Sequence, residues 1–561
     1  MSLEAKIDAV KAAVKQHKLD EDNLRREEPL IRYWDSEYSL KGVGGAERNA
    51  KFAWVSNDTG QGQVELDFDH PIAQWIHDTE GRVARGEGRT VNLTVDYCGA
   101  RWSGFLDKYV VEQGSDGDVV LKADFNHDYE HVKWVSCWSN PYLNTAIQLP
   151  RAWMCAGPLD WALKHTLLVN LVREHNPNLT WPADPLDKDN WAGPHRTGLD
   201  QSQWHMAVHP GTFLESMNAG IMWGVVTSRF ATFHDVAHIL LEDSELSVRC
   251  DRWLVGDPPP WEDGDGNPYV PRHGQLIINI VDKSGIFVGT NHGGNLFDGL
   301  KRTIVDFADS FIDSTSELID DAPAPVDYFS PGNKYTTPEK PFVVFREGET
   351  SPIESSQWIH SPSKGIQVLV GGHSMPGVNE VIGATISGVA DLWGTLILIG
   401  GLGNSIDQIL KPLYEDCFLA WQTAKSKERS ENTGWSRLFE FFQQGANNAY
   451  TVAGLLVLRA GFWATKTATS WKVNVADGLP FLIGDRGKGH FFLDDRIGIV
   501  LTGDTQIHMD RARKLELGWT EEAPPEWQIS VGDERNLQDP AQRALGRIEK
   551  IIAGMRDLGV Y

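Results

Sequence analysis

A serine, an aspartate and a histidine follow one another in the chain order that some hydrolase triads use. Ser374 stands in the run Gly371-Gly-His-Ser-Met-Pro-Gly, which approximates the G-x-S-x-G turn of serine hydrolases, and Asp477 and His490 come later. Pro376 takes the place of the closing glycine, where a strained strand-to-helix turn needs a small and flexible residue. The sequence before the run also lacks alternating strand and helix patterns and an HGGG-like oxyanion loop. A triad is therefore kept only as an alternative.

Two other local patterns are typical of metal sites. His234 and His238 are four residues apart on a predicted helix, close to H-E-x-x-H, but Asp235 replaces the catalytic glutamate and no third ligand has plausible spacing. Asp263-Gly-Asp-Gly-Asn resembles the start of a calcium loop, with Pro268 at the position of the invariant glycine. We interpret the first as ordinary helical histidines and the second as a turn. With no phosphate-binding loop or dinucleotide fingerprint, the sequence predicts no metal, no cofactor and no enzyme.

The segment from Val381 to Leu402 is mostly apolar and carries one charge, Asp391. As a straight helix it would span about 33 Å, enough to cross the hydrocarbon core of a bilayer. Its glycines disfavour a straight helix, so two interpretations stay open: a helical hairpin buried in an assembly, or a membrane contact. The apolar residues that we expect to form this plug or contact are Val381, Ile382, Ile386, Val389, Leu392, Trp393, Leu396, Leu398, Ile399 and Leu402.

The composition limits the possible partners. The chain has 561 residues and a formal net charge of −25, from 77 acidic and 52 basic residues. Such a charge repels phosphate backbones, so we expect no specific nucleic-acid binding, although DNA could slide past the surface. The five cysteines are scattered without a C-x-x-C pair, and the first residues lack the apolar core of a signal peptide. We therefore expect folding in a reducing cytoplasm.

Hydrophobic periodicity predicts an α+β protein of several domains. Strands are expected over 30–34, 64–68, 91–95 and 119–125, with a short helix from Pro71. The middle of the chain predicts helices over 159–173 and 232–241 and strands over 246–254 and 275–281, and strands return near 471–475, 496–501, 514–519 and 527–531. The predicted division is an N-terminal amphipathic helix (1–28), a first β-rich tube- or barrel-like domain (29–150), a helical and α+β middle domain (151–321), a Pro-rich linker (322–341), a second β-rich tube-like domain (342–531) with a helical apolar insertion (376–463), and a C-terminal helix (532–561).

Short blocks along the chain together resemble one known family. They are Tyr33-Trp-Asp-Ser-Glu-Tyr-Ser-Leu-Lys-Gly, Asn57-Asp-Thr-Gly-Gln-Gly, Ala100-Arg-Trp-Ser-Gly, Trp138-Ser-Asn-Pro, Gly256-Asp-Pro-Pro-Pro-Trp, Val281-Asp-Lys-Ser-Gly, Gly293-Gly-Asn-Leu-Phe, Gly371-Gly-His-Ser, Lys411-Pro-Leu-Tyr-Glu-Asp and Gly489-His-Phe-Phe-Leu-Asp-Asp-Arg-Ile-Gly. With these blocks the chain resembles the minor tail proteins of actinobacterial siphophages, especially the mycobacteriophage type, from about residue 30 to residue 530.

The resemblance implies a structural virion protein of the baseplate-hub or tail-tip type, assembled in the host cytoplasm. Members of the hub class form a homotrimeric ring with two tube-like β domains per chain, which closes the tail tube and takes part in host attachment and DNA passage. The implied partners are further copies, the distal tail, tape-measure and other minor tail proteins, and the host envelope. Two alternatives remain: a serine hydrolase acting on the host envelope through Ser374, and a hexameric distal-tail adaptor.

Overall fold

The computed structural model divides the chain into two compact units. Unit 1 comprises 1–300, 317–358 and 471–532, and unit 2 comprises 301–316, 359–470 and 533–561. The residues that the structure describes are 3–115, 117–143, 148–150, 152–175, 201–262, 266–283, 317–319, 343–348, 353–362, 365–371, 421–442, 468–475, 481–500, 502–503 and 507–532. The predicted linker (322–341), most of the predicted apolar insertion and residues 533–561 therefore lie outside the described part.

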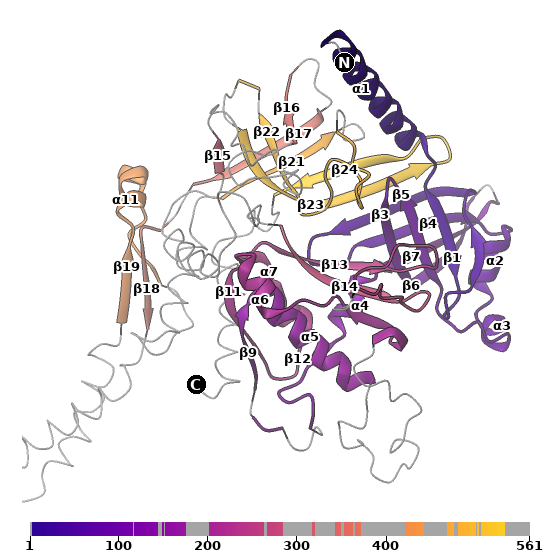
Figure 1. Cartoon of the computed structure of the whole chain (residues 1–561), viewed down its shortest axis with the longest axis horizontal. Helices are drawn as coiled ribbons and strands as arrows, with labels where there is room; N and C mark the ends of the chain where they lie inside the picture. The colour runs from indigo at the N-terminus through magenta and orange to yellow at the C-terminus, as the bar shows by residue number, and fades with distance from the viewer. Residues whose placement is uncertain are drawn as a thin grey trace, which may run out of the picture. The chain divides into compact units, whose positions relative to one another are not determined.

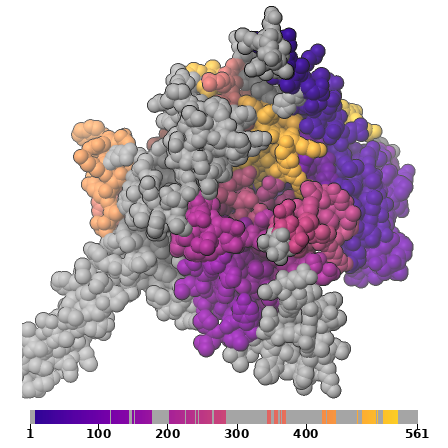
Figure 2. Space-filling view, in the orientation of Figure 1, coloured from indigo at the N-terminus to yellow at the C-terminus, as the bar shows by residue number. Residues whose placement is uncertain are grey.

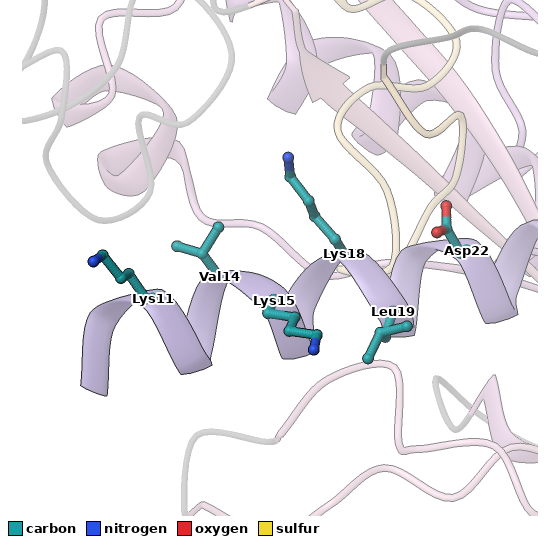
Figure 3. A pocket seen from close by; sticks show the side chains of 6 residues that line it. All are labelled: Lys11, Val14, Lys15, Lys18, Leu19 and Asp22. Atoms are coloured by element: carbon teal, nitrogen blue, oxygen red, sulfur yellow. The ribbon is translucent and has the colours of Figure 1, made fainter. Parts of the chain in front are cut away.

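Unit 1 begins with α1 (Leu3–Arg26), a helix held at its C-terminal end. Leu24 packs against the core, and the Tyr97 hydroxyl donates to the Arg25 carbonyl at 3.0 Å. Figure 2 shows α1 at the surface of the molecule. A hollow along the helix is lined by residues of α1 alone, whose side chains point to different sides, so it is a helix surface rather than an enclosed pocket (Figure 3).

The first β-rich segment contains seven strands and three short helices. They are β1 (Leu30–Trp34), β2 (Leu40–Val43), β3 (Glu47–Val55), β4 (Gln61–Asp67), α2 (Pro71–His77), α3 (Thr79–Ala84), β5 (Asn92–Tyr97), β6 (Ala100–Gln113), β7 (Val119–His127) and α4 (Tyr129–Lys133). The predictions of β1, β4, β5, β7 and α2 are confirmed, whereas β2, β3, β6, α3 and α4 were not predicted. Helix α2 starts where expected because Pro71 suits the first turn and the His70 side chain accepts from the Ile72 amide.

The second β-rich segment continues the same sheet. Its strands are β15 (Glu317–Ile319), β16 (Val344–Arg346), β17 (Ile353–Ser361), β21 (Ala468–Val475), β22 (Arg496–Val500), β23 (Ile507–Thr520) and β24 (Glu526–Val531). The shared sheet has 14 strands, with the main order β17-β21-β24-β23-β3-β4-β7-β6-β5-β1-β2 (Figure 1). The predicted strands β21 to β24 are confirmed, and the protein is mixed α+β with one large sheet.

The middle segment of unit 1 has its own core. It contains β8 (Ser136–Cys137), β9 (Trp153–Pro158), α5 (Leu159–His175), η2 (Gln201–Gln203), β10 (Met206–Val208), α6 (Phe213–Asn218), β11 (Trp223–Ser228), β12 (Ala231–Thr232), α7 (Phe233–Asp243), β13 (Leu246–Arg252) and β14 (Leu276–Asp282). The predicted elements α5, α7, β13 and β14 are confirmed. Leu163 and Leu167 of α5 pack with Phe233 of α7 and Ile278 of β14, and all four are fully buried.

Unit 2 is described over a small three-stranded sheet and two turns of helix. Its elements are β18 (Gln367–Gly371), β19 (Trp421–Lys425), α11 (Lys427–Thr433), η4 (Gly434–Ser436) and β20 (Phe441–Phe442), in the sheet order β19-β18-β20. We expected the apolar insertion over 376–463 to be helical, and this is wrong for β19 and for 437–442. Gly434 has a φ of 53°, which a continuing right-handed helix does not allow, and Phe441 and Phe442 pair with β18.

Candidate functional site: the seam between the two β-rich segments

Both ring nitrogens of His490 contact other parts of the fold. Its Nδ1 accepts a hydrogen bond from the Leu482 amide at 2.9 Å, and its Nε2 lies 3.1 Å from a carboxylate oxygen of Glu21 on α1. Both ring nitrogens therefore serve to hold α1 and the loop before β22. Ser374 and Asp477, the other two residues of the alternative triad, lie outside the described residues.

The histidine pair on α7 is engaged with an aromatic neighbour. His234 Nδ1 lies 3.0 Å from the Tyr129 hydroxyl, and the rings of His234 and His238 meet edge to face at 5.0 Å. Within the described ranges, no group of three His, Cys, Asp or Glu residues is arranged to hold a metal ion. The calcium-like residues Asp263 and Asp265 fall in a gap of the description.

The predicted apolar site, from Val381 to Leu402, also lies outside the described residues. All ten of its apolar residues are included in that gap, so their role stays a prediction. Of the helices that the structure does describe, none is long and apolar enough to span a membrane.

Among the described residues, the two β-rich segments are joined where β3 pairs with β23, and we call this pairing the seam. The two strands pair antiparallel from Lys514↔Val55 to Thr520↔Asn49, although they are more than 450 residues apart in the chain. On the core side Leu517 lies opposite Phe52, and both are fully buried. Trp54, one pair further along the core, lies 5.2 Å from Trp527 between ring centroids. Aromatic rings thus close the core across the seam.

The other face of the seam is polar. A shallow groove of about 330 Å³ crosses β23, β3, β4 and β7 there, lined among others by Lys51, Gln63 and Glu516. Both Lys51 and Lys514 form ion pairs with Glu516, the latter at 2.8 Å. Burial alone would raise the pKa of Glu516, but the hydrogen bonds from the two lysines outweigh burial and lower that pKa.

Cross-strand hydrogen bonds continue this polar face over the first β-rich segment. The Gln63 side-chain amide donates to Asp124 at 3.0 Å, and that of Gln61 donates to Asn126 at 2.8 Å. These pairs lie directly opposite one another on β4 and β7. Over β23, β3, β4 and β7 the sheet is therefore apolar on the core side and polar and hydrogen-bonded on the other.

A buried carboxylate, Asp494, joins three parts of unit 1 behind the seam. It accepts hydrogen bonds from Ser56 after β3 at 2.5 Å and from Ser247 of β13 at 2.6 Å. Arg511 of β23, itself buried, places a guanidinium nitrogen 3.7 Å from the same carboxylate. Burial, together with neighbouring Arg513, lowers the pKa of Arg511. Removal of Asp494 would leave a buried cation with reduced compensation.

Further ion pairs bind the middle segment to the second β-rich segment. The side chains of Arg496 and Glu245 meet at 2.5 Å, and those of Lys283 and Asp495 at 2.6 Å. The middle segment is also bound to the first β-rich segment, where the side-chain oxygen of Asn57 accepts from the Val248 amide at 2.9 Å. These contacts arrange side chains for rigidity and offer no pairing of a nucleophile with a base.

Sequence reasoning missed the seam for an identifiable reason. Neither β3 nor β6 was predicted, and the block that contains Asp494 was noted only as part of a resemblance. The available signal was an aspartate within an apolar run followed by Arg496. The pairing of β3 with β23 brings together distant parts of the chain and leaves no local signal in one sequence.

The chain is similar to known phage tail proteins over nearly its full length. The family model described as "Siphovirus ReqiPepy6 Gp37-like protein" matches residues 30–533. "Minor tail protein Gp28" of Mycobacterium phage L5 is 29% identical, and the protein of the same name from Mycobacterium phage D29 is 30% identical. Each alignment covers 98% of this chain and 97% of the relative.

Solved structures resemble the chain only loosely. A tail protein from Neisseria meningitidis MC58 has a TM-score of 0.39 at 7% identity, covering 91% of this chain and 98% of that one. The 43 kDa tail protein of prophage MuSo2 from Shewanella oneidensis has a TM-score of 0.38 at 10% identity, covering 91% of this chain and 100% of the other. Scores this low do not establish a shared fold.

Proposed function

This chain belongs to the Siphovirus ReqiPepy6 Gp37-like family of siphophage minor tail proteins, and from that premise we propose that it is a hub subunit of the tail tip. The protein is a component of the virion tail. In the proposed role three copies form a ring that closes the tail tube, takes part in host attachment and lets DNA pass. The role is structural, without catalysis.

One observation supports the ring more than any other: the two β-rich segments share a sheet whose polar face runs from β23 across β3 and β4 to β7. A channel wall needs an outer core and a hydrated inner surface, and the seam between β3 and β23 provides both without interruption. The formal net charge of −25 of the whole chain adds to this argument, because an acidic protein does not retain passing DNA. We assign the polar face of the shared sheet to the channel.

The apolar segment, Val381 to Leu402, has a place in the same proposal. Three copies at the ring axis would bury one another and plug the channel, or meet the end of the tape-measure protein, and on opening they would engage the host envelope. Replacing Leu396, Leu398 and Ile399 together with Asp should abolish assembly or infection, since it places three charges in that contact. Normal particles at an unchanged titre would contradict this role.

Stoichiometry tests the hub itself. Intact tails should contain three copies of the chain by quantitative mass spectrometry, and the purified assembly should be a ring with three times the chain mass of 62.6 kDa. Six copies per tail would favour the distal-tail adaptor. A single copy per tail would contradict both roles.

The hydrolase alternative has its own test. A fluorophosphonate probe should leave the protein unlabelled if the role is purely structural. Labelling that disappears in Ser374→Ala would support the hydrolase instead. The contacts of His490 with Leu482 and Glu21 count against that outcome, since both imidazole nitrogens are already used.

A further inference from the structure

The shared sheet contains the same five-strand arrangement twice. In the first block the strands are ordered β3-β4-β7-β6-β5, and in the second block they are ordered β17-β21-β24-β23-β22. The pairs β4·β7, β6·β7 and β5·β6 are antiparallel, and so are β21·β24, β23·β24 and β22·β23. The strand order therefore repeats over five strands, and the antiparallel direction repeats over these three pairs.

The strand register repeats as well. The long strands β6 and β23 each have 14 residues, and each pairs first with the preceding strand and later with the following one. The register of β6 with β7 shifts between Leu106 and Lys108, and that of β23 with β24 shifts between Ala512 and Lys514. Superposing the two shifts makes Val111 the counterpart of Leu517. Both lie opposite a buried residue, Leu121 on β7 and Trp527 on β24.

The two blocks differ at the outer side of the long strand. The C-terminal part of β23 lies between β24 and β3, and Leu515 and Leu517 are fully buried there. The C-terminal part of β6, Asp107–Gln113, pairs with β7 on one side, and no described strand pairs with its other side. Val111 is accordingly 37% exposed and its neighbour Val110 is 44% exposed. The position that β3 covers at Leu517 in the second block is therefore partly exposed at Val111 in the first block.

The opposite end of the sheet offers the matching strand. β17 occupies in the second block the place that β3 occupies in the first, and it is the terminal strand of the sheet order. Its sequence, IESSQWIHS, contains no proline and no lysine, the residues that commonly protect a free edge. Ser355, Ser356 and Gln357 on this strand are exposed. Among the described strands, the sheet thus has one edge, on β6, with no strand paired to it, and one terminal strand, β17, on which Ser355, Ser356 and Gln357 are exposed.

We propose that β17 of a second copy of this chain pairs antiparallel with Asp107–Gln113 of β6, repeating between copies the pairing of β3 with β23 inside the chain. This inference rests on the proposed ring and identifies the surfaces that close it. The contact is head to tail, because each copy gives β17 to one neighbour and receives β17 from the other. Since each copy has two blocks joined by the same contact, the ring closes with nearly equivalent joints throughout.

Cysteine cross-linking in assembled tails tests the pairing. Val110 corresponds to Glu516, whose partner inside the chain is Ala53. Val110→Cys is combined in one chain with Ser355→Cys, Ser356→Cys or Gln357→Cys, one at a time. On oxidation, at least one combination should convert the chain into covalent multimers on a non-reducing gel. None of the four single-cysteine variants should form such multimers.

The chain offers a matched positive control. Glu516→Cys with Ala53→Cys should cross-link within one chain, because these residues are already paired. If the control closes and tails hold three copies, yet no combination with β17 yields multimers, the pairing is wrong while the proposed ring stands. If tails hold a single copy, the proposed ring fails with it.

A charge at the open edge gives an independent readout. Val111→Asp should leave the isolated chain folded, because the side chain is already partly exposed, but should reduce ring formation and titre at least tenfold. Val83→Asp on α3, at a residue that is 40% exposed, is the matched control and should leave both unchanged. Normal rings with Val111→Asp would overturn the proposed pairing.

Discussion

Leu517 and Val111 occupy equivalent positions in two blocks of one sheet, and their surroundings differ. Leu517 is fully buried because β3 completes the sheet beside it, whereas Val111 is 37% exposed at an edge of β6 to which no described strand is paired. Aliphatic side chains at an unprotected strand edge favour pairing with another chain. The comparison indicates that the edge of β6 at Asp107–Gln113 lacks the paired strand that β3 provides to the equivalent part of β23.

The largest loss of stability is expected from a change behind the pairing of β3 with β23. Asp494→Ala removes the acceptor of Ser56 and Ser247 and leaves buried Arg511 with less compensation, so it should destabilise the isolated chain by about 3–5 kcal/mol. The midpoint of denaturant unfolding measures this loss. Asp494→Asn keeps one acceptor oxygen, so its unfolding midpoint should lie between those of wild type and Asp494→Ala. A midpoint equal to wild type in Asp494→Ala would show that the carboxylate does not hold the seam.

Truncation at the two equivalent positions sharpens the comparison itself. Leu517→Ala opens a cavity in a closed core and should cost about 3 kcal/mol in the isolated chain. Val111→Ala removes a side chain that is already partly in water and should cost less than about 1 kcal/mol. Both are read from unfolding midpoints. Equal losses would mean that the open edge is covered within a single chain.

Acid should weaken the anchor of the first block. Asp128, just after β7, forms a buried ion pair with Arg252 of β13 at 2.9 Å. Burial alone would raise the pKa of Asp128, but Arg252 outweighs burial and lowers it from 3.8 to about 2. A lowered carboxylate pKa stabilises the fold above pH 4, and about 2 kcal/mol is then lost as the pH falls toward 2. Asp128→Asn should remove this pH dependence. If Asp128→Asn loses as much stability as wild type between pH 4 and pH 2, other groups cause that loss.

The sequence predicted strands wherever one face is buried and alternation is regular. In β4 and β24 apolar residues alternate with polar ones, and both strands were predicted. In β3 Phe52, Ala53 and Trp54 are all buried in succession, so burial does not alternate at that end of the strand. In β6 adjacent Val110 and Val111 are both exposed, so alternation is lost at the open edge. Two of the strands that were not predicted, β3 and β6, thus lack the regular alternation of β4 and β24.

The candidate site was less predictable than the fold. His490 was considered only as the histidine of the alternative triad, and its partners in the structure, Leu482 and Glu21, give it a structural role. The buried contacts of Asp494 connect segments nearly 440 residues apart, and only the folded chain reveals them. The family was predictable, because short blocks along the whole chain carry the resemblance.

Amide hydrogen exchange is the most direct test of the central comparison. It should be followed by mass spectrometry for peptides covering 107–113 of β6 and 514–520 of β23, in the isolated chain and in assembled tails. We expect the β23 peptide to be protected in both states, and the β6 peptide to exchange freely in the isolated chain and to become protected in tails. A β6 peptide that stays unprotected in tails, or is as protected as β23 in the isolated chain, would contradict the account.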